Sequence, residues 1–193
     1  MNSCHLRLDR SRESIPGAAT ADLRHEHVVI LRALAIVERL GERLAAGRPV
    51  SDATVSELVH LLRTFADRCH HGKEEDHLFP ALQAKGAGDA LPVFLDEHEE
   101  GRGYLRTLAG EGSPAERAAA ARRYVGLLRG HIERENEVLF PLAEGLFTPE
   151  EHAALARAYA DVDHQIVAPG EHDRLLARLA GIEAAVPLAG LEP

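Results

Sequence analysis

The chain has 193 residues, of which 45% are hydrophobic and 27% are charged. This composition is ordinary for a globular protein and excludes disorder as the main state of the chain. The formal net charge of −9 disfavours nucleic acid and anionic membrane surfaces as partners, because both bind clustered Lys and Arg. A metal ion or a small molecule fits this charge better.

The sequence also bears on the compartment of the protein. No apolar run approaches the roughly 20 residues that a membrane-spanning helix needs. Residues 1–12 lack the apolar segment of a secretory signal, and the only cysteines are Cys4 and Cys69. We therefore expect a cytoplasmic protein with free thiols. Histidine is the unusual residue, with 12 copies and no Trp beside them.

The predicted elements are all helices, separated by glycine and proline. The first four are expected at 20–46, from 51 or 52 to about 84, from 89 to about 108, and from 114 onward. The fourth start is the clearest, because Ser113, Pro114 and Glu116 form a capping box. No segment has the alternating pattern of a strand, so no sheet is expected.

Two further helices are predicted beyond these four. Thr148-Pro149-Glu150-Glu151 repeats the capping pattern and predicts a helix to about Val162, and another is expected at 171–186. Long helices with short loops predict an all-α, antiparallel up-down four-helix bundle with C-terminal extra helices. The expected organisation is a flexible arm at 1–18, the bundle at 19–147 and a helical extension at 148–193 that packs on the bundle.

Helical periodicity places a histidine on the apolar face of several long helices. At about 100° per residue, His27, His98 and His131 fall within apolar stripes, and Glu135 shares the face of His131. His25 points away from its stripe. The stripes are Leu23, Ile30, Leu34 and Val37 in the first helix, Leu91, Phe94, Leu105 and Leu108 in the third, and Tyr124, Leu128, Ile132, Val138, Leu139 and Leu142 in the fourth.

The second helix offers two histidine and glutamate pairs, His70 with Glu74 and His71 with Glu75. An internal repeat distinguishes them, because the segment from His70 through Glu74 to Leu-Phe-Pro recurs 61 residues later, starting at His131. This repeat favours His70 and Glu74 as the pair that faces the core. His71 and Glu75 are then expected to face outward.

Residues i and i+4 of a helix stand on one face, about 6 Å apart, so an imidazole and a carboxylate can reach a common ion. A carboxylate buried among hydrocarbon groups is costly without a cationic partner. Such donors suit iron or manganese, with zinc as a further alternative, and carboxylates that bridge two ions would make the site dinuclear. The candidate metal ligands are His27, His70, Glu74, His98, His131 and Glu135.

Each histidine taken alone has a plainer interpretation, since a single imidazole on an apolar face is more often a hydrogen-bonded core residue. The joint pattern across four helices favours metal binding. Cys69 is expected to be a packed thiol. The histidines without a carboxylate partner are expected at the surface or at an interface, with His77 as a candidate contact to the ligand set; they are His60, His77, His152, His164 and His172.

On these residues the sequence resembles the hemerythrin-like family of HHE cation-binding proteins. The resemblance covers about Leu23 to Glu144. It implies a non-haem di-iron centre in which His27 and His70 hold one ion, His98 and His131 hold the other, and Glu74 and Glu135 bridge them. The resembling segments are Glu26-His27, His70-His71-Gly72-Lys73-Glu74-Glu75 with Leu78-Phe79-Pro80, Glu97-His98, and His131-x3-Glu135 with Leu139-Phe140-Pro141.

The sequence also departs from the oxygen-carrying hemerythrins. Their third helix has a second histidine one turn after the first, where this chain has Arg102, and their fourth-helix carboxylate is an Asp at i+5 where this chain has Glu135 at i+4. The five-histidine site is therefore not expected, which argues against reversible oxygen transport. Tyr104, Tyr124 and Arg102 are candidates for tuning the centre.

The resemblance implies a protein that binds or reacts with O2, H2O2 or NO in stress defence or sensing. A catalase-like or peroxidase reaction is the enzyme form of this hypothesis. An iron-handling or iron-sensing module without turnover is the alternative, and a helical protein without metal is the third interpretation. The pattern does not specify an oligomeric state.

Overall fold

The structure, a computed structural model, describes residues 18–166 and 171–186. Every regular element within these two ranges is helical, which confirms the predicted all-α class. The predicted arm at 1–18 and the end of the chain at 187–193 lie almost wholly outside the described residues. No helix in the described ranges is long and apolar enough to cross a membrane.

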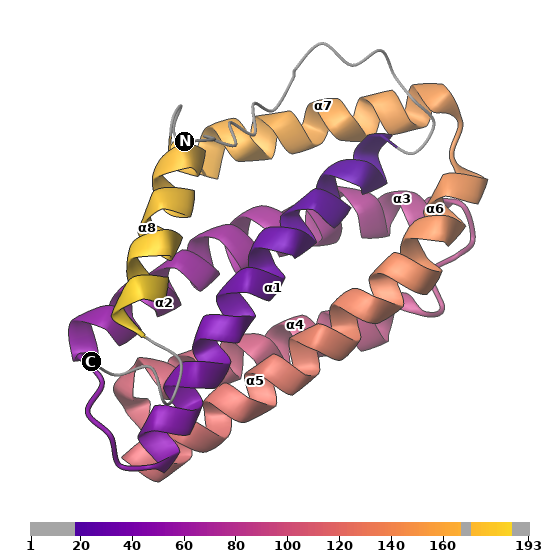
Figure 1. Cartoon of the computed structure of the whole chain (residues 1–193). Helices are drawn as coiled ribbons and strands as arrows, with labels where there is room; N and C mark the ends of the chain where they lie inside the picture. Colours follow the sequence, from indigo (N-terminus) through magenta and orange to yellow (C-terminus); the bar gives the residue numbers. More distant parts are fainter. Residues whose placement is uncertain (1–17, 167–170, 187–193) are drawn as a thin grey trace.

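Four long helical rods run back and forth along one axis, and two further helices lie on their outside (Figure 1). Segments with π-helical hydrogen bonding, labelled η, interrupt three of the rods. The elements are α1 (Ala18–Ala45); α2 (Asp52–Leu62), η1 (Arg63–His71), η2 (Glu74–Leu78) and α3 (Phe79–Ala84); α4 (Leu91–Arg106) and η3 (Thr107–Glu111); α5 (Pro114–Arg134), η4 (Glu135–Leu139) and α6 (Phe140–Leu146); α7 (Pro149–Ile166); and α8 (Glu171–Ala185).

Two of these helices begin with the capping boxes that the sequence predicts. Before α5, the backbone N–H of Ser113 donates to Glu116 Oε2 at 2.7 Å, and the backbone N–H of Glu116 donates to Ser113 Oγ at 3.3 Å. Thr148 and Glu151 make the same exchange before α7, at 2.8 and 3.3 Å. These bonds satisfy N–H groups that the first helical turn leaves unpaired. α7 runs to Ile166, one turn beyond the predicted end.

The π-helical segments occur where the internal repeat places a proline. Pro80 and Pro141 each lie just after a Leu-Phe pair, and each follows a π-helical segment at the same offset of 61 residues, η2 and η4. A proline inside a helix cannot donate to the carbonyl four residues earlier, and its ring crowds that carbonyl. A wider turn relieves this conflict, and such turns occur often at functional sites. The repeated proline thus explains the paired π-helical segments.

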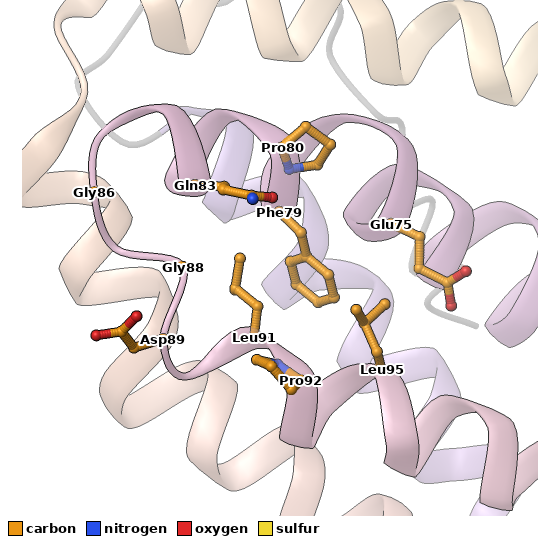
Figure 2. A pocket seen from close by; sticks show the side chains of 10 residues that line it. All are labelled: Glu75, Phe79, Pro80, Gln83, Gly86, Gly88, Asp89, Leu91, Pro92 and Leu95. Atoms are coloured by element: carbon orange, nitrogen blue, oxygen red, sulfur yellow. The ribbon is translucent and has the colours of Figure 1, made fainter.

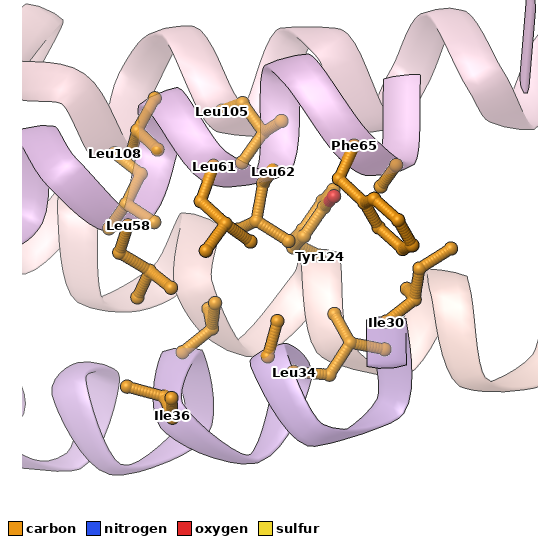
Figure 3. Packing of buried hydrophobic residues seen from close by; sticks show 14 of the residues in the cluster. Ile30, Leu34, Ile36, Leu58, Leu61, Leu62, Phe65, Leu105, Leu108 and Tyr124 are labelled. Atoms are coloured by element: carbon orange, nitrogen blue, oxygen red, sulfur yellow. The ribbon is translucent and has the colours of Figure 1, made fainter. Parts of the chain in front are cut away.

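The hydrophobic core has two parts along the rods. The larger part lies among α1, α2, η1, α4, η3 and α5, and Figure 3 shows Leu34 of α1 facing Leu62 of α2 and Tyr124 of α5 within it. Burying each such leucine contributes about 1.5–3 kcal/mol. The predicted stripes are buried apart from two residues of the fourth helix. Val138 and Leu142 are 63% and 40% exposed, so their assignment to the core face was wrong.

The smaller part of the core lies under α7. It joins Leu23 of α1, Phe79 of α3 and Phe140 of α6 to Leu155 and Tyr159 of α7. α8 instead packs on α1 and α2 and adds Leu175, Leu179 and Ile182 to the larger part. The space between the two hydrophobic parts contains the histidines described next.

Candidate metal centre

The structure brings together all six residues that the sequence predicts as ligands. They come from all four rods, and each is at most 1% exposed. They are His27 of α1, His70 of η1, Glu74 of η2, His98 of α4, His131 of α5 and Glu135 of η4. Residues more than a hundred positions apart in the sequence therefore form one buried polar group.

The imidazoles form two pairs, and each of two carboxylates reaches both. The Nε2 atoms of His27 and His70 are 2.9 Å apart, and those of His98 and His131 are 3.0 Å apart. Glu74 lies 3.6 Å from the Nε2 atoms of both His70 and His98, through different oxygens. Glu135 lies 3.2 Å from His27 and 3.1 Å from His131, again through different oxygens.

Each imidazole is fixed from behind by an acceptor on a neighbouring rod. These four contacts close a ring around the rods. They join His70 Nδ1 to Glu26 Oε2 at 2.8 Å, His98 Nδ1 to Glu75 Oε1 at 2.7 Å, His131 Nδ1 to Glu97 Oε2 at 2.8 Å, and His27 Nδ1 to Asn136 Oδ1 at 3.1 Å. Because these oxygens only accept hydrogen bonds, Nδ1 carries the proton and the Nε2 lone pair faces the centre.

The inner atoms of this group lack hydrogen-bond donors. Both carboxylate oxygens of Glu74 and of Glu135 are buried without a hydrogen-bond partner, and such groups are costly. Cations between the lone pairs would satisfy them. Nitrogen atoms 2.9–3.0 Å apart have the spacing of adjacent ligands on one ion, about 1.4 times a metal–nitrogen bond of roughly 2.1 Å. The donor set therefore fits a pair of metal ions such as iron.

The electrostatics of the four groups are coupled. Burial raises the pKa of Glu74 well above its ordinary value, and the charge of Glu135 adds to this effect. Burial also lowers the pKa of His70 well below its usual range, helped by His27. For Glu135, burial acts to raise the pKa, but His131 and His27 outweigh it and hold that pKa well below its ordinary value. Without metal, protons have to balance these charges.

Two sequence predictions at this site were wrong. His71 was expected to face outward, but it is 4% exposed and its ring stacks on His98 with centroids 3.8 Å apart. Its Nδ1 has no hydrogen-bond partner and lies within 4.8 Å of ligand atoms of Glu74, His98 and His131. Glu75 is only partly exposed and accepts from His98. The cause is η1, since a π-helix turns less than 100° per residue and brings both His70 and His71 inward.

The carboxylates behind the imidazoles are themselves held by basic side chains. Lys73 bonds Glu26, Arg134 bonds Glu97, and Arg102 donates to Glu75 at 2.7 Å. The sequence analysis did not assign roles to these acids. A signal was available, because Glu26-His27 recurs as Glu97-His98 at an offset of 71, and Lys73 recurs as Arg134 at 61.

The remaining candidates have other surroundings. Arg102 does touch the ring around the centre, whereas Tyr104 bonds Glu100 at the surface. Cys69 is a packed free thiol, as expected. His152, expected at the surface or an interface, is 1% exposed instead and packs edge-on against Phe147.

Aromatic rings separate the centre from solvent at the end of the bundle. Phe140 stacks on His27 with centroids 5.4 Å apart, and Phe79 stacks on His98 at 5.8 Å. A pocket of about 450 Å³ lies on the outer side of Phe79, between α3 and α4. Figure 2 shows Phe79 and Leu91 pointing into this pocket, with Glu75 at one edge. The pocket therefore ends next to two side chains that touch His98.

The comparisons with known proteins agree with this geometry. The family model for the hemerythrin HHE cation-binding domain matches residues 18–143. Similar proteins include uncharacterized proteins of Mycobacterium bovis and Mycobacterium tuberculosis, each 26% identical over 189 residues, which cover 93% of this chain and 74% of the relative. No solved structure matches the chain. The chain belongs to the hemerythrin HHE cation-binding domain family, whose members bind metal cations.

Proposed function

We propose that the chain binds two iron ions and reacts with a small oxidant or diatomic ligand, H2O2, O2 or NO, in a stress response or as a sensor. His27 and His70 hold one ion, His98 and His131 hold the other, and Glu74 and Glu135 span both. The observation that supports this proposal is the convergence of four Nε2 lone pairs and four unpartnered carboxylate oxygens in one buried space.

Iron bound here would supply one-electron chemistry and open coordination positions for a small ligand. The protein side of the site prepares for this. The ring of Nδ1 contacts fixes the orientation of every imidazole and raises its basicity. Phe79 and Phe140 exclude bulk water from the ends of the imidazole pairs, which strengthens the electrostatic interactions inside. Manganese and zinc rank below iron as occupants.

The pocket beside Phe79 is the proposed approach for the small ligand. It reaches the stacked pair of Phe79 and His98, and Leu95 stands at its rim, 43% exposed (Figure 2). Leu95→Trp should fill the pocket and slow the association of NO severalfold, without changing iron content. Stopped-flow mixing of the ferrous protein with NO measures this rate, and an unchanged rate would place the approach elsewhere.

Metal analysis together with an optical spectrum tests the iron site. Protein purified from iron-replete cells should contain about two irons per chain and show charge-transfer bands of a bridged pair. His27→Ala should lose most of this iron, whereas His25→Ala, an exposed position on the same helix, should keep it. Equal iron content in the two variants would refute the ligand set.

Peroxide turnover separates the enzyme hypothesis from its alternative. If the protein is an enzyme, the iron-loaded form should release oxygen from H2O2 over many turnovers per centre. A stoichiometric reaction that bleaches the spectrum and then stops would favour an iron-handling or iron-sensing module. An oxygen electrode read alongside the optical spectrum distinguishes these outcomes.

A further inference from the structure

Helix α7 lies outside the residues that match the family model, which end at 143, yet it packs on the elements that hold one half of the metal centre. It lies along α1, η1 and η2, which provide His27, His70 and Glu74. Asp163 on α7 contacts this half through a side chain of η1 and a lysine next to η2. The extension is therefore placed to act on the ion held by His27 and His70.

A continuous series of polar contacts connects Asp163 to His70. Lys73 is 1% exposed, and its Nζ lies 2.6 Å from Asp163 and also donates to Glu26. The other oxygen of Glu26 accepts from His70 Nδ1 at 2.8 Å. Although Asp163 itself is 48% exposed, the rest of the series is buried, where water and salt screen charges little.

We propose that Asp163 is a positioning residue for the iron held by His27 and His70, an inference that rests on the proposed iron-binding function. With Asp163 in place, Lys73 shares its positive charge between two carboxylates, so Glu26 remains a strong acceptor for the Nδ1–H of His70. Without that carboxylate, Lys73 neutralises Glu26 alone. The weaker acceptor then makes His70 a weaker donor to metal and leaves its ring less firmly oriented.

The other half of the centre shows why this effect should be confined to one ion. There Arg134 takes the place of Lys73 and Glu97 the place of Glu26, as the internal repeats require. Arg134 is 45% exposed, so solvent screens its pairing with Glu97. The counterpart of the Asp163 contact at Lys73 is thus solvent at Arg134, and the two ion positions should respond differently to a change in α7.

The third group of potential metal ligands in the described residues, Glu26, Cys69 and Asp163, is part of the same series. Its centre is already served by the ammonium of Lys73, which contacts both acids. Cys69 donates to the same Asp163 oxygen at 3.0 Å. This cluster is therefore an ion-pair network that supports the centre, and a control is needed for the thiol contact.

Anaerobic titration of the metal-free protein with ferrous ion against a competing chelator tests the proposal. Asp163→Asn should weaken one of the two binding steps about 10-fold, the lower end of the range for residues behind metal ligands, and leave the other step unchanged. Loss of a nearby negative charge should also raise the midpoint potential of one iron. Asp163→Glu, which keeps the carboxylate, should restore both values.

Two matched variants separate this role from a structural one. Glu151→Gln removes another α7 ion pair, with Lys85 at 2.7 Å, and should change neither binding step. Cys69→Ala removes the thiol contact and should also leave both steps unchanged. Equal affinities at both steps in Asp163→Asn and wild type, equal weakening of both steps, or the same loss in Cys69→Ala would each overturn the proposal. A wild-type chain that binds no iron pair would instead overturn the proposed function and this inference with it.

Discussion

The outer nitrogen of each inner histidine bonds an acceptor from a neighbouring rod, so no imidazole in the centre depends on its own helix for orientation. His27 uses Asn136, and the other three use Glu26, Glu75 and Glu97. Deleting one imidazole therefore removes a metal ligand and one link between two rods. Substitutions at this scale should affect metal binding and stability together.

His70 and His71 are adjacent but belong to different halves of the centre. His70→Ala should remove the ion shared with His27, because its Nε2 lies 2.9 Å from that of His27. His71→Leu should spare that ion and weaken the other one, since His71 lies beside His98 and His131. Ferrous titration of both variants checks this, and identical metal loss in the two would contradict the assignment of His71.

Tyr159 has a buried hydroxyl without a hydrogen-bond partner. Burial raises its pKa well above the ordinary value, with the charges of Glu74, Glu26 and Asp22 adding to the effect. Tyr159→Phe should stabilise the metal-free protein by about 1 kcal/mol, because an unsatisfied buried hydroxyl is removed while the ring is kept. Urea unfolding measures the change. A loss of stability would mean that the hydroxyl has a partner in solution, such as an ordered water.

At the scale of elements, close approach between α1 and α5 sets the diameter of the bundle. Gly41 of α1 lies against Ala121 of α5, and a Cβ added at Gly41 would sit 2.8 Å from the Ala121 Cβ. Only glycine lets the two rods pack this closely. The same pair of rods holds His27 and His131 in the centre, so their separation matters for the ligand geometry as well.

Gly41→Ala should destabilise the protein by about 1–3 kcal/mol, because overpacking outweighs the better helix propensity of alanine. Gly126→Ala on α5 is the matched control, since nothing lies within 4 Å of the added Cβ, and it should stabilise the protein by up to about 1 kcal/mol. Thermal unfolding of both variants gives the comparison. Stabilisation by both substitutions would show that the rods can separate at little cost.

At the scale of the whole molecule, metal and protons compete for the charges that hold the four rods together. The raised pKa of Glu74, caused by burial and then by Glu135, means that the folded metal-free protein binds a proton that the unfolded chain has released. The stability from this group is complete below its unfolded pKa of about 4.5 and is lost as pH rises through the folded value. The lowered pKa of His70 acts in the opposite direction, as pH falls below 6.5.

Comparison with Glu74→Gln isolates the carboxylate contribution. The stability of metal-free wild type relative to Glu74→Gln should fall with rising pH above about 4.5, by up to about 1.4 kcal/mol per pH unit. Ferrous ion should reverse this loss in wild type at pH 7, and less at pH 5, where protons compete for the ligands. Denaturant unfolding across this pH range measures it. A difference that stays flat would mean that Glu74 is ionised in the folded metal-free protein.

The sequence by itself determined the helices and the six central residues, because periodicity and the spacing of His with Glu at i+4 are local properties. The repeat of His70, Glu74 and Leu-Phe-Pro 61 residues later was visible in the same way. Only the tertiary structure decided the inward position of His71, the acids behind the imidazoles and the contact of Asp163 with Lys73. These depend on π-helical turns and on how separate helices rotate against one another, which a regular 100° repeat does not encode.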